Sequence, residues 1–370
     1  MSPQSRDKGR QQVRSVFGSD DAGIDLGGAT LFQLKNNDIG IDLGTANTVF
    51  YMKNRGIVLD EPSVLAMRRS IRGTKKVVAV GGKAKDMLGK TPDSVSVDQP
   101  LRDGVISDFE AAKTMLNHFL AHIDRKRFAV KPRIVISVPY NVTPIERRAV
   151  KEAAESAGKG EVYLIEEPMA AAIGIGLPIA EPAGSMIVDI GAGITEIAVI
   201  SLSGIVYCNS IRTAGEEIDQ AIVNYVKRKH NLLIGEQTAE KIKIAIGSAS
   251  PGLDHTERTL KVNGRNLVDG IPKPVTISSR EVREAIIEPV YSIVDAIRIA
   301  LERMPPELAS DIIDTGIVLS GGGALLKNVD FLIEKITQVP VYIADNATTA
   351  VAEGAGRALD QLALLKEISS

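Results

Sequence analysis

One short sequence pattern occurs twice in this chain and constrains its fold more than any other feature. Each copy has an apolar strand that ends in Asp, then a Gly, a turn of small residues, a Thr and a second apolar strand. The first copy spans Ile39–Tyr51 and the second spans Met186–Ile200. Each therefore describes a tight β-hairpin with a carboxylate at the end of its first strand. Because a duplicated hairpin is hard to obtain by chance, the repeat carries more weight than either Asp-Gly turn alone.

The turns of both hairpins have the residue types that bind phosphate groups. Gly44, Gly191 and Gly193 allow the main chain to come close to a ligand. Successive amide groups in such turns form a concave cluster that binds phosphate oxygens. Thr45 and Asn47 add side-chain donors to the first turn. Two such turns that face each other would hold a triphosphate from both sides.

The two hairpin aspartates, Asp42 and Asp189, suit a different task. A carboxylate repels a phosphate group, but it attracts a hydrated Mg²⁺ ion that the phosphates also bind. We therefore expect both aspartates to hold Mg²⁺ through water molecules.

A third small-residue cluster follows an apolar strand near the C-terminus and consists of Gly321, Gly322, Gly323 and Ala324. Three glycines between a strand and a helix leave room for a flat group, such as a base or a ribose, against the backbone. The cluster lacks the Lys and the Ser or Thr of a P-loop, and no Gly-x-Gly-x-x-Gly opens a helix after a strand. The sequence thus favours neither a P-loop enzyme nor a dinucleotide-binding fold.

Length and composition narrow the class of protein further. A chain of 370 residues favours two domains over one. The net charge of −2, the absence of Trp and the aromatic content of 4% argue against a nucleic-acid partner. One cysteine, no apolar run long enough to cross a membrane and no secretory signal predict a soluble cytoplasmic protein.

Residues 1–37 differ from the rest of the chain. The first part is polar and basic, and its apolar residues Val13, Val16 and Phe17 would share one face of a helix. Two readings remain open, a disordered tail or an anchor that lies on a membrane surface. The basic turn Arg125–Phe128 is a second membrane candidate, through Phe128, although most charge runs are simply solvated.

From residue 38 onward, short β-branched runs alternate with helical patterns, which predicts sheets covered by helices. Strands are expected at 38–52, 133–139, 162–165, 186–200, 205–211, 316–320 and 339–344. Helices are expected at 108–123, 144–157, 169–174, 217–230, 238–246, 279–301 and 351–365. Within the Pro-, Gly- and Asn-containing segment 251–274, Asn263-Gly264 predicts the type I′ turn of a hairpin.

These features resemble the superfamily of actins, heat-shock chaperones and sugar kinases, and several strings resemble its MreB family of bacterial actins. The strings are Asp42–Thr48, Glu61–Val64, Pro100–Ile106, Glu146–Arg148, Leu164–Gly174 and Thr349–Gly356. The resemblance implies an α/β, duplicated ribonuclease H-like actin fold with a nucleotide between two domains. Domain I would span 38–168 with a small subdomain near 63–100, and domain II 169–370 with one near 214–274.

The resemblance also implies site residues and a mechanism. Phosphate-binding residues would be Thr45, Ala46, Asn47, Gly191, Ala192 and Gly193, with Gly321, Gly322, Gly323 and Ala324 lining the adenosine. Ribose and base contacts would come from Glu240, Lys241, Ile242 and Lys243. Glu146 would position the attacking water, and Glu167 is a weaker candidate near the metal. Without the resemblance, the sequence favours a glutamate that faces solvent and pairs with Arg147 or Lys151.

The family resemblance further implies an ATPase that uses ATP and Mg²⁺ and assembles into paired filaments of itself. Such filaments would lie on the inner face of the cell membrane with membrane proteins of the cell-wall elongation or division machinery, and would organise peptidoglycan synthesis. A small-molecule kinase and a chaperone ATPase fit less well, since neither an extra acidic constellation nor a substrate-binding domain is evident.

The second hairpin departs from the family pattern Asp-x-Gly-Gly-Gly-Thr-Thr-Glu. Ala192 replaces a glycine, which we expect to restrict the backbone, and Ile194 replaces a hydroxyl residue close to the phosphates. Main-chain donors remain, so nucleotide binding is expected to survive. The rate of hydrolysis is expected to suffer, and a scaffold that does not hydrolyse ATP stays an alternative.

Overall fold

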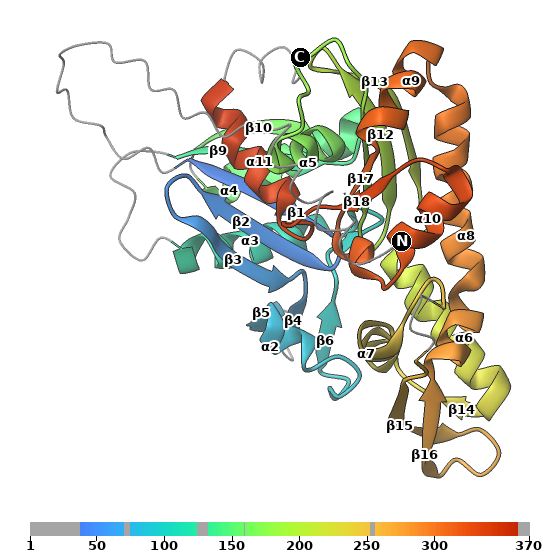
Figure 1. The fold of residues 1–370 in the computed structure, drawn as a ribbon. Helices are drawn as coiled ribbons and strands as arrows, with labels where there is room; N and C mark the ends of the chain where they lie inside the picture. The colour runs from blue at the N-terminus through green and yellow to red at the C-terminus, as the bar shows by residue number, and fades with distance from the viewer. Residues whose placement is uncertain (1–37, 70–74, 124–131, 159, 252–255, 362–370) are drawn as a thin grey trace.

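Two five-stranded sheets form the centre of the molecule in the computed structural model (Figure 1). The structure describes residues 38–69, 75–123, 132–158, 160–251 and 256–361. The first sheet has the order β10-β9-β1-β2-β3 and the second β13-β12-β11-β17-β18. The strands of the first sheet are β1 (Ile39–Leu43), β2 (Asn47–Met52), β3 (Gly56–Pro62), β9 (Arg133–Val138) and β10 (Glu161–Glu166). Those of the second are β11 (Ser185–Ile190), β12 (Thr195–Ser201), β13 (Gly204–Ile211), β17 (Ile317–Ser320) and β18 (Val341–Ile343).

The repeated sequence pattern occupies the same place in both sheets. β1 pairs antiparallel with β2 and parallel with β9, and β11 pairs antiparallel with β12 and parallel with β17. In the register, Asp42 lies opposite Val49, and Asp189 lies opposite Glu196. The two hairpins predicted from the sequence are therefore confirmed, and the duplication extends to the neighbouring strand on either side.

Two smaller sheets lie at the lower end of the view in Figure 1. One has the order β5-β4-β6, and the other has the order β14-β15-β16. Their strands are β4 (Leu65–Arg69), β5 (Lys75–Val80), β6 (Val95–Asp98), β14 (Leu232–Leu233), β15 (Thr259–Asn266) and β16 (Pro272–Ser278). A short ladder joins β7 (Leu101–Arg102) to β8 (Val105–Ile106). The boundaries of the two domains stay a prediction.

Helices occur where the apolar periodicity predicted them, with ends that differ by a few residues. These are α3 (Phe109–Ile123), α4 (Pro144–Gly158), α5 (Glu167–Ile175), α6 (Gly215–His230), α7 (Glu236–Ile246), α8 (Ser279–Arg303) and α11 (Ala350–Ala358). The sequence reading did not predict α2 (Gly82–Lys85), α9 (Pro306–Thr315), α10 (Val329–Thr337) or the short 3-10 helices η1 (Gly322–Leu325) and η2 (Leu359–Gln361). The last predicted helix ends earlier than expected, and residues 362–365 lie outside the described part of the chain.

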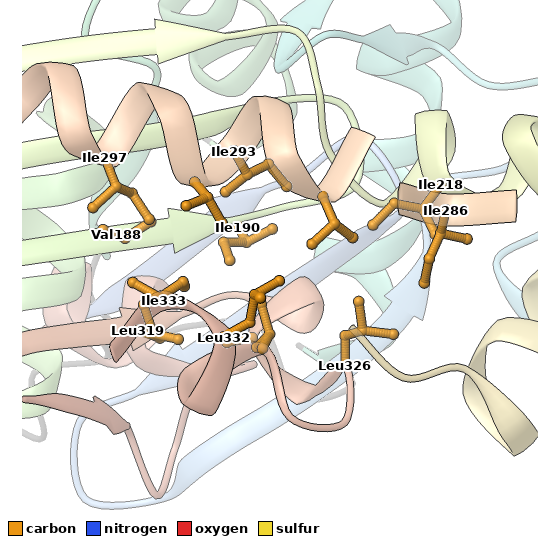
Figure 2. Close-up of a cluster of buried hydrophobic side chains, with 14 of the residues drawn as sticks. Val188, Ile190, Ile218, Ile286, Ile293, Ile297, Leu319, Leu326, Leu332 and Ile333 are labelled. Carbon is orange, nitrogen blue, oxygen red and sulfur yellow. The ribbon is translucent and has the colours of Figure 1, made fainter. Parts of the chain in front are cut away.

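The largest hydrophobic core lies beneath the second hairpin (Figure 2). Ile293 and Ile297 of α8 pack over Val188 and Ile190 of β11 in this core. These side chains are almost completely buried. Each buried residue of this size contributes roughly 1.5–3 kcal/mol by the removal of apolar surface from water. The core therefore holds β11, and with it Asp189, in a rigid frame.

A separate core joins the two large sheets. It combines side chains of both sheets with those of α5 and α11. The two helices cross at glycines: a Cβ atom on Gly354 would overlap the carbonyl oxygen of Ala170, and one on Gly174 would overlap that of Ala350. Because only glycine allows this approach, the crossing places the two sheets at a defined separation.

The turn predicted at Asn263-Gly264 is wrong. Both residues lie inside β15, where Asn263 pairs with Pro274 and Gly264 pairs with Lys273. A Cβ on Gly264 would lie 2.7 Å from the carbonyl oxygen of Leu233, so glycine serves here for close packing against β14. The chain turns further on, where the side chain of Asn266 accepts a hydrogen bond from the amide of Val268.

Among the described residues, no helix combines the length and apolar character needed to cross a bilayer. The membrane candidates Val13, Val16, Phe17 and Phe128 lie outside the described residues.

Candidate functional site

In the turn of the first hairpin, Ser63 binds two carbonyl groups, while amide groups remain available to a ligand. The hydroxyl of Ser63 donates to the carbonyl oxygen of Gly44 at 2.7 Å, and the amide of Ser63 donates to that of Ala46 at 2.8 Å. Within the described part of the chain, the amides of Thr45 and Ala46 have no hydrogen-bond partner. Unpaired amides that follow one another in a turn form an anion site.

In the second turn, two carbonyl groups are likewise bound, here by the start of helix α6 rather than by a serine. The first amides of α6 bind the turn carbonyls: Gly215 donates to Gly191 at 3.1 Å, and Glu216 donates to Ala192 at 2.8 Å. Among residues that the structure describes, the amides of Ala192 and Gly193 are unpaired. Among the described residues, each turn therefore leaves two amides that could donate to a phosphate, while two of its carbonyl groups are already bound.

The two turns meet at the loop between β7 and β8. The amide of Gly104 donates to Thr45 Oγ1 at 2.9 Å. A Cβ on Gly193 would lie 2.9 Å from the same oxygen and 3.0 Å from the amide nitrogen of Asp103. Glycine at position 193 is thus required by close approach, and the two amide clusters face one another across this contact.

The departures in the second hairpin have different structural consequences. Ala192 does not adopt a positive φ, so an alanine fits the turn without backbone strain, and its restriction of the backbone stays a prediction. Ile194 is buried, and its Cδ1 atom lies 3.0 Å from the position of a Cβ on Gly104. Its side chain therefore makes an apolar contact between the halves, where the family pattern has a hydroxyl.

Each hairpin aspartate accepts a hydrogen bond from a serine on the neighbouring parallel strand. Ser137 donates to Asp42 Oδ1 at 3.3 Å, and Ser320 donates to Asp189 Oδ1 at 2.6 Å. Burial, followed by the negative charge of Asp189, raises the pKa of Asp42 to about 7. Burial also raises the pKa of Asp189, against the effect of Ser320. A carboxylate pair of this kind is stabilised by a cation.

Glu167, the weaker metal candidate, lies close to this pair. It is the buried first residue of α5, and its pKa is raised well above normal by burial and by the charges of Glu196, Asp42 and Asp189. Within the described residues, no three acidic, His or Cys side chains are close enough to coordinate a metal directly. The arrangement fits Mg²⁺, which keeps several of its waters and binds carboxylates through them.

Glu146 caps its own helix. Both the amide and the hydroxyl of Thr143 donate to its Oε2 atom, at 2.8 and 2.6 Å, as in a capping box. These bonds, together with the charge of Arg212, lower the pKa of Glu146. The predicted pairing with Arg147 is absent, because Arg147 binds Glu166 at 3.1 Å. Among the described residues, every hydrogen bond to the carboxylate uses Oε2, which leaves Oε1 to accept one from water.

The glycine cluster after β17 packs against the second hairpin. Gly321 has a φ of 82° and, like Gly323, has no room for a Cβ beside Ile190. Gly322 has open space where its Cβ would be, and Ala324 is buried in the core. Of the predicted adenosine-lining residues, Gly322 is therefore the one that faces open space.

The predicted ribose- and base-contacting residues of helix α7 differ in burial and in their contacts. Ile242 is completely buried, so its part is structural, and Lys241 is exposed. Lys243 donates to the carbonyl oxygen of Gly215 at 2.8 Å and to Asp219 at 2.7 Å, which links α7 to the start of α6. Glu240 accepts from Lys85 of α2 at 2.8 Å.

Asn47, the remaining predicted phosphate ligand, lies beside the first turn. Its side chain is exposed and donates to Asp60 at 2.8 Å. Sequence reasoning missed several residues that the structure brings to the site: Ser63, Lys85, Asp103, Ser137, Glu196 and Ser320. Asp103 fell within a string noted for its resemblance, and Ser320 begins the glycine cluster. Ser63 also lies within such a string, and Glu196 occupies the last position of the family pattern of the second hairpin. Lys85 and Ser137 gave no signal, because their contacts join segments far apart in the sequence.

Comparisons with known proteins agree with this geometry. The family model described as MreB/Mbl protein matches residues 36–367. The cell shape-determining protein MreB of Escherichia coli is 52% identical over 329 residues, which cover 88% of this chain and 94% of that protein. The cell shape-determining protein Mbl of Bacillus subtilis is 49% identical over 325 residues, which cover 88% and 96%.

Solved structures show the same fold. MreB5 of Spiroplasma citri bound to AMPPNP superposes with a TM-score of 0.83 at 38% identity and covers 89% of this chain and 97% of its own. The MamK double helical filament has a TM-score of 0.73 at 23% identity, with 87% and 98% covered, and supports the fold alone. The predicted actin-like α/β fold is confirmed, and the chain belongs to the MreB/Mbl family.

Proposed function

We propose that this chain is an actin-like cytoskeletal ATPase that determines cell shape. The observation that carries the proposal is the pair of facing turns, each with two carbonyl groups bound by neighbouring residues and, within the described structure, two amides left unpaired. Support comes from the AMPPNP-bound relative of Spiroplasma citri and from the curated relatives, which are named as cell shape-determining proteins.

In the proposed site, the amides of Thr45 and Ala46 bind the triphosphate from one side and those of Ala192 and Gly193 from the other. These fixed donors oppose the charge that develops on the phosphate oxygens, and they need no reorganisation during the reaction. The glycine cluster around Gly322 takes the adenosine, with α7 opposite. Mg²⁺, when bound, neutralises charge on the phosphate oxygens.

Hydrolysis in this proposal requires a positioned water molecule. Glu146 is ionised at neutral pH because its pKa is lowered, so its Oε1 atom accepts a hydrogen bond from the water. The water oxygen bonds to the terminal phosphorus in line while the bond from that phosphorus to the leaving oxygen of ADP breaks, and the proton of the water remains on the phosphate product. Because Thr143 holds the other carboxylate oxygen, Glu146 has a defined orientation for this task.

At the level of the cell, we propose paired filaments at the inner membrane surface, in the cytoplasm. They would organise peptidoglycan synthesis together with membrane proteins of the elongation or division machinery. The family membership supports this assignment.

The proposal is tested by sedimentation of the purified chain with and without ATP and Mg²⁺, with phosphate release recorded in the same samples. We expect ATP-dependent pelleting and slow phosphate release, with release abolished and nucleotide binding kept in Glu146→Ala. Phosphate release only upon addition of a sugar or another acceptor would indicate a kinase instead. Absence of nucleotide binding would overturn the proposal.

A second candidate function, a filament scaffold that binds ATP without hydrolysing it, is favoured by one observation. Ile194 places an apolar side chain at the contact between the hairpins, where the family pattern has a hydroxyl. In this case filaments would pellet with ATP while phosphate release stayed at the level of Glu146→Ala.

A further inference from the structure

Glu196 is a completely buried acid for which the proposed reaction has no direct use. It lies on β12, three residues after Gly193 of the second hairpin, and no part of it is exposed. Its Oε1 atom accepts hydrogen bonds from the amide of Tyr140 at 2.9 Å and from the hydroxyl of Ser210 at 2.6 Å. In the described structure, its Oε2 atom is buried and has no hydrogen-bond partner.

A carboxylate at this buried position lowers the stability of the folded protein. Burial of a charged or half-satisfied polar group costs several kcal/mol unless partners compensate, and the neighbours of Glu196 on β12 are buried as well. An apolar residue would pack on this strand without that cost. The position therefore needs a function that only an acceptor of hydrogen bonds supplies.

The bond to Tyr140 links the two halves of the molecule. Tyr140 belongs to the segment between β9 and α4, whereas Glu196 belongs to the second sheet. Three residues after Tyr140, Thr143 immediately precedes α4 and holds Glu146 through two hydrogen bonds. A short segment thus joins the amide that Glu196 binds to the carboxylate that would position the water.

Ser210 orients this contact from the other side. It lies opposite Glu196 in the register of β12 and β13, and its hydroxyl binds the same oxygen as Tyr140. Oε1 is therefore aimed at the Tyr140 amide by the sheet itself. The second hairpin, Glu196, the Tyr140 segment and Glu146 form one continuous chain of contacts.

We propose that Glu196 is a positioning residue for ATP hydrolysis, which holds the Glu146-bearing segment in register with the phosphate-binding turn of the second hairpin. The inference rests on the proposed ATPase function. Displacement of a positioned group by about 1 Å can cost on the order of a hundredfold in rate, so loss of this hydrogen bond affects turnover without altering the phosphate ligands. Glu196 itself touches neither nucleotide nor water in this proposal.

The test compares Glu196→Ala with Glu196→Gln in the full chain. The alanine variant loses the acceptor for Tyr140, while the glutamine variant keeps an oxygen of the same reach and lacks the charge. We expect Glu196→Ala to lower kcat by about tenfold to a hundredfold with the Kd for ADP nearly unchanged, and Glu196→Gln to keep most of the wild-type kcat.

Amide hydrogen exchange supplies a readout that does not depend on activity. Without nucleotide, a peptide covering residues 139–146 should exchange faster in Glu196→Ala than in wild type, and at the wild-type rate in Glu196→Gln. A purely structural role would instead weaken nucleotide binding and turnover together. Equal kcat and equal exchange in wild type and Glu196→Ala would overturn the inference, as would equal losses of kcat in both variants.

The same measurements separate this inference from the proposed function. If wild type and Glu146→Ala release phosphate equally slowly, the ATPase proposal fails. The exchange data then decide independently whether Glu196 holds the Tyr140 segment. If wild type hydrolyses ATP and Glu146→Ala does not, the kinetic comparison of the Glu196 variants bears on the inference alone.

Discussion

Single residues at the contact between the hairpins decide how well this site can work. Gly193 is required by its approach to Thr45, and Ala192 fits without strain. Ile194 fills the contact with apolar atoms beside Gly104 and Pro139. Nucleotide binding through main-chain amides is compatible with all three residues, whereas hydrolysis depends on polar groups around the attacking water.

Replacement of Ile194 by Thr should raise the rate of phosphate release, because a hydroxyl returns to the contact near the terminal phosphate. An increase of about tenfold is the scale expected for one added hydrogen-bonding group in a transition state. Single-turnover phosphate release measures it, and Ile194→Val serves as the control, since it removes a similar volume without adding a hydroxyl. An unchanged or lower rate in the threonine variant would contradict the prediction.

Glu196 should also make the stability of the nucleotide-free protein depend on pH. Burial is the main cause that raises its pKa to about 7, with the charges of Asp189 and Glu166 adding to it. The unfolded chain releases this proton near pH 4.3, so the folded state binds more protons between pH 4 and 7, and stability falls as pH rises through that window.

The measurement is urea unfolding at pH 5, 6, 7 and 8. From pH 5 to 8, wild type should lose on the order of 2–3 kcal/mol more than Glu196→Gln. Other buried acids titrate in both proteins, and the charge of Glu196 raises the pKa of Glu167, so the difference between the two curves reports Glu196 together with its effect on Glu167. Parallel curves would show that Glu196 does not change its protonation on unfolding.

Among the secondary-structure elements, α2 and α7 contact each other through hydrogen bonds. Lys85 of α2 donates to Glu240 of α7 at 2.8 Å, and Gln237 donates to the carbonyl oxygen of Lys85 at 2.5 Å. These bonds join the small sheet of the first half to that of the second. Because Glu240 is also a predicted ribose or base ligand, we expect this contact to lie beside the bound nucleotide.

Lys85→Ala should therefore accelerate the release of ADP. Both side chains of the pair are about one-third exposed, and such pairs contribute roughly 0–1 kcal/mol, which corresponds to an increase of up to about fivefold. Stopped-flow displacement of a fluorescent ADP measures the rate. Lys83→Ala is the matched control, since it removes the same charge from an exposed position of the same helix. Equal rates in both variants would refute the role of the contact.

At the scale of the whole molecule, several contacts among the described residues join the two halves. The glycine crossing of α5 and α11 sets their separation, and the hairpin turns meet around Thr45. In addition, α2 contacts α7, and the amide of Tyr140 donates to Glu196. Rigid cores lie on both sides of the hairpin contact. Changes in the nucleotide are therefore expected to alter the relation between the halves rather than the halves themselves.

Removal of residues 1–18 should weaken the association of the protein with anionic liposomes. This segment carries Arg6, Lys8, Arg10 and Arg14, each of which would contribute about 1 kcal/mol near an anionic surface. Co-sedimentation of the full and truncated chains measures the effect, with neutral liposomes and high salt as controls, since both suppress the electrostatic part. Equal sedimentation of the two chains would leave Phe128 as the membrane candidate to test.

The sequence by itself determined the parts of this protein that depend on local pattern. A strand, an Asp-x-Gly turn and a second strand form a hairpin in both places where the pattern was recognised, so Asp42 and Asp189 could be placed at equivalent strand ends. Apolar periodicity likewise located most helices. Local pattern failed at Gly264, because the same residue serves a turn or a close strand contact, and only the neighbour β14 decides between them.

Only the tertiary structure decided which groups act together. The turn amides are left unpaired while Ser63 and α6 bind neighbouring carbonyl groups, and these contacts depend on the fold. The bond between Glu196 and Tyr140 likewise joins residues that are distant in the sequence. The physical reason is that hydrogen bonding and burial depend on distances in space. In this chain, those distances are set by the packing of two sheets whose contacting residues lie far apart in the sequence.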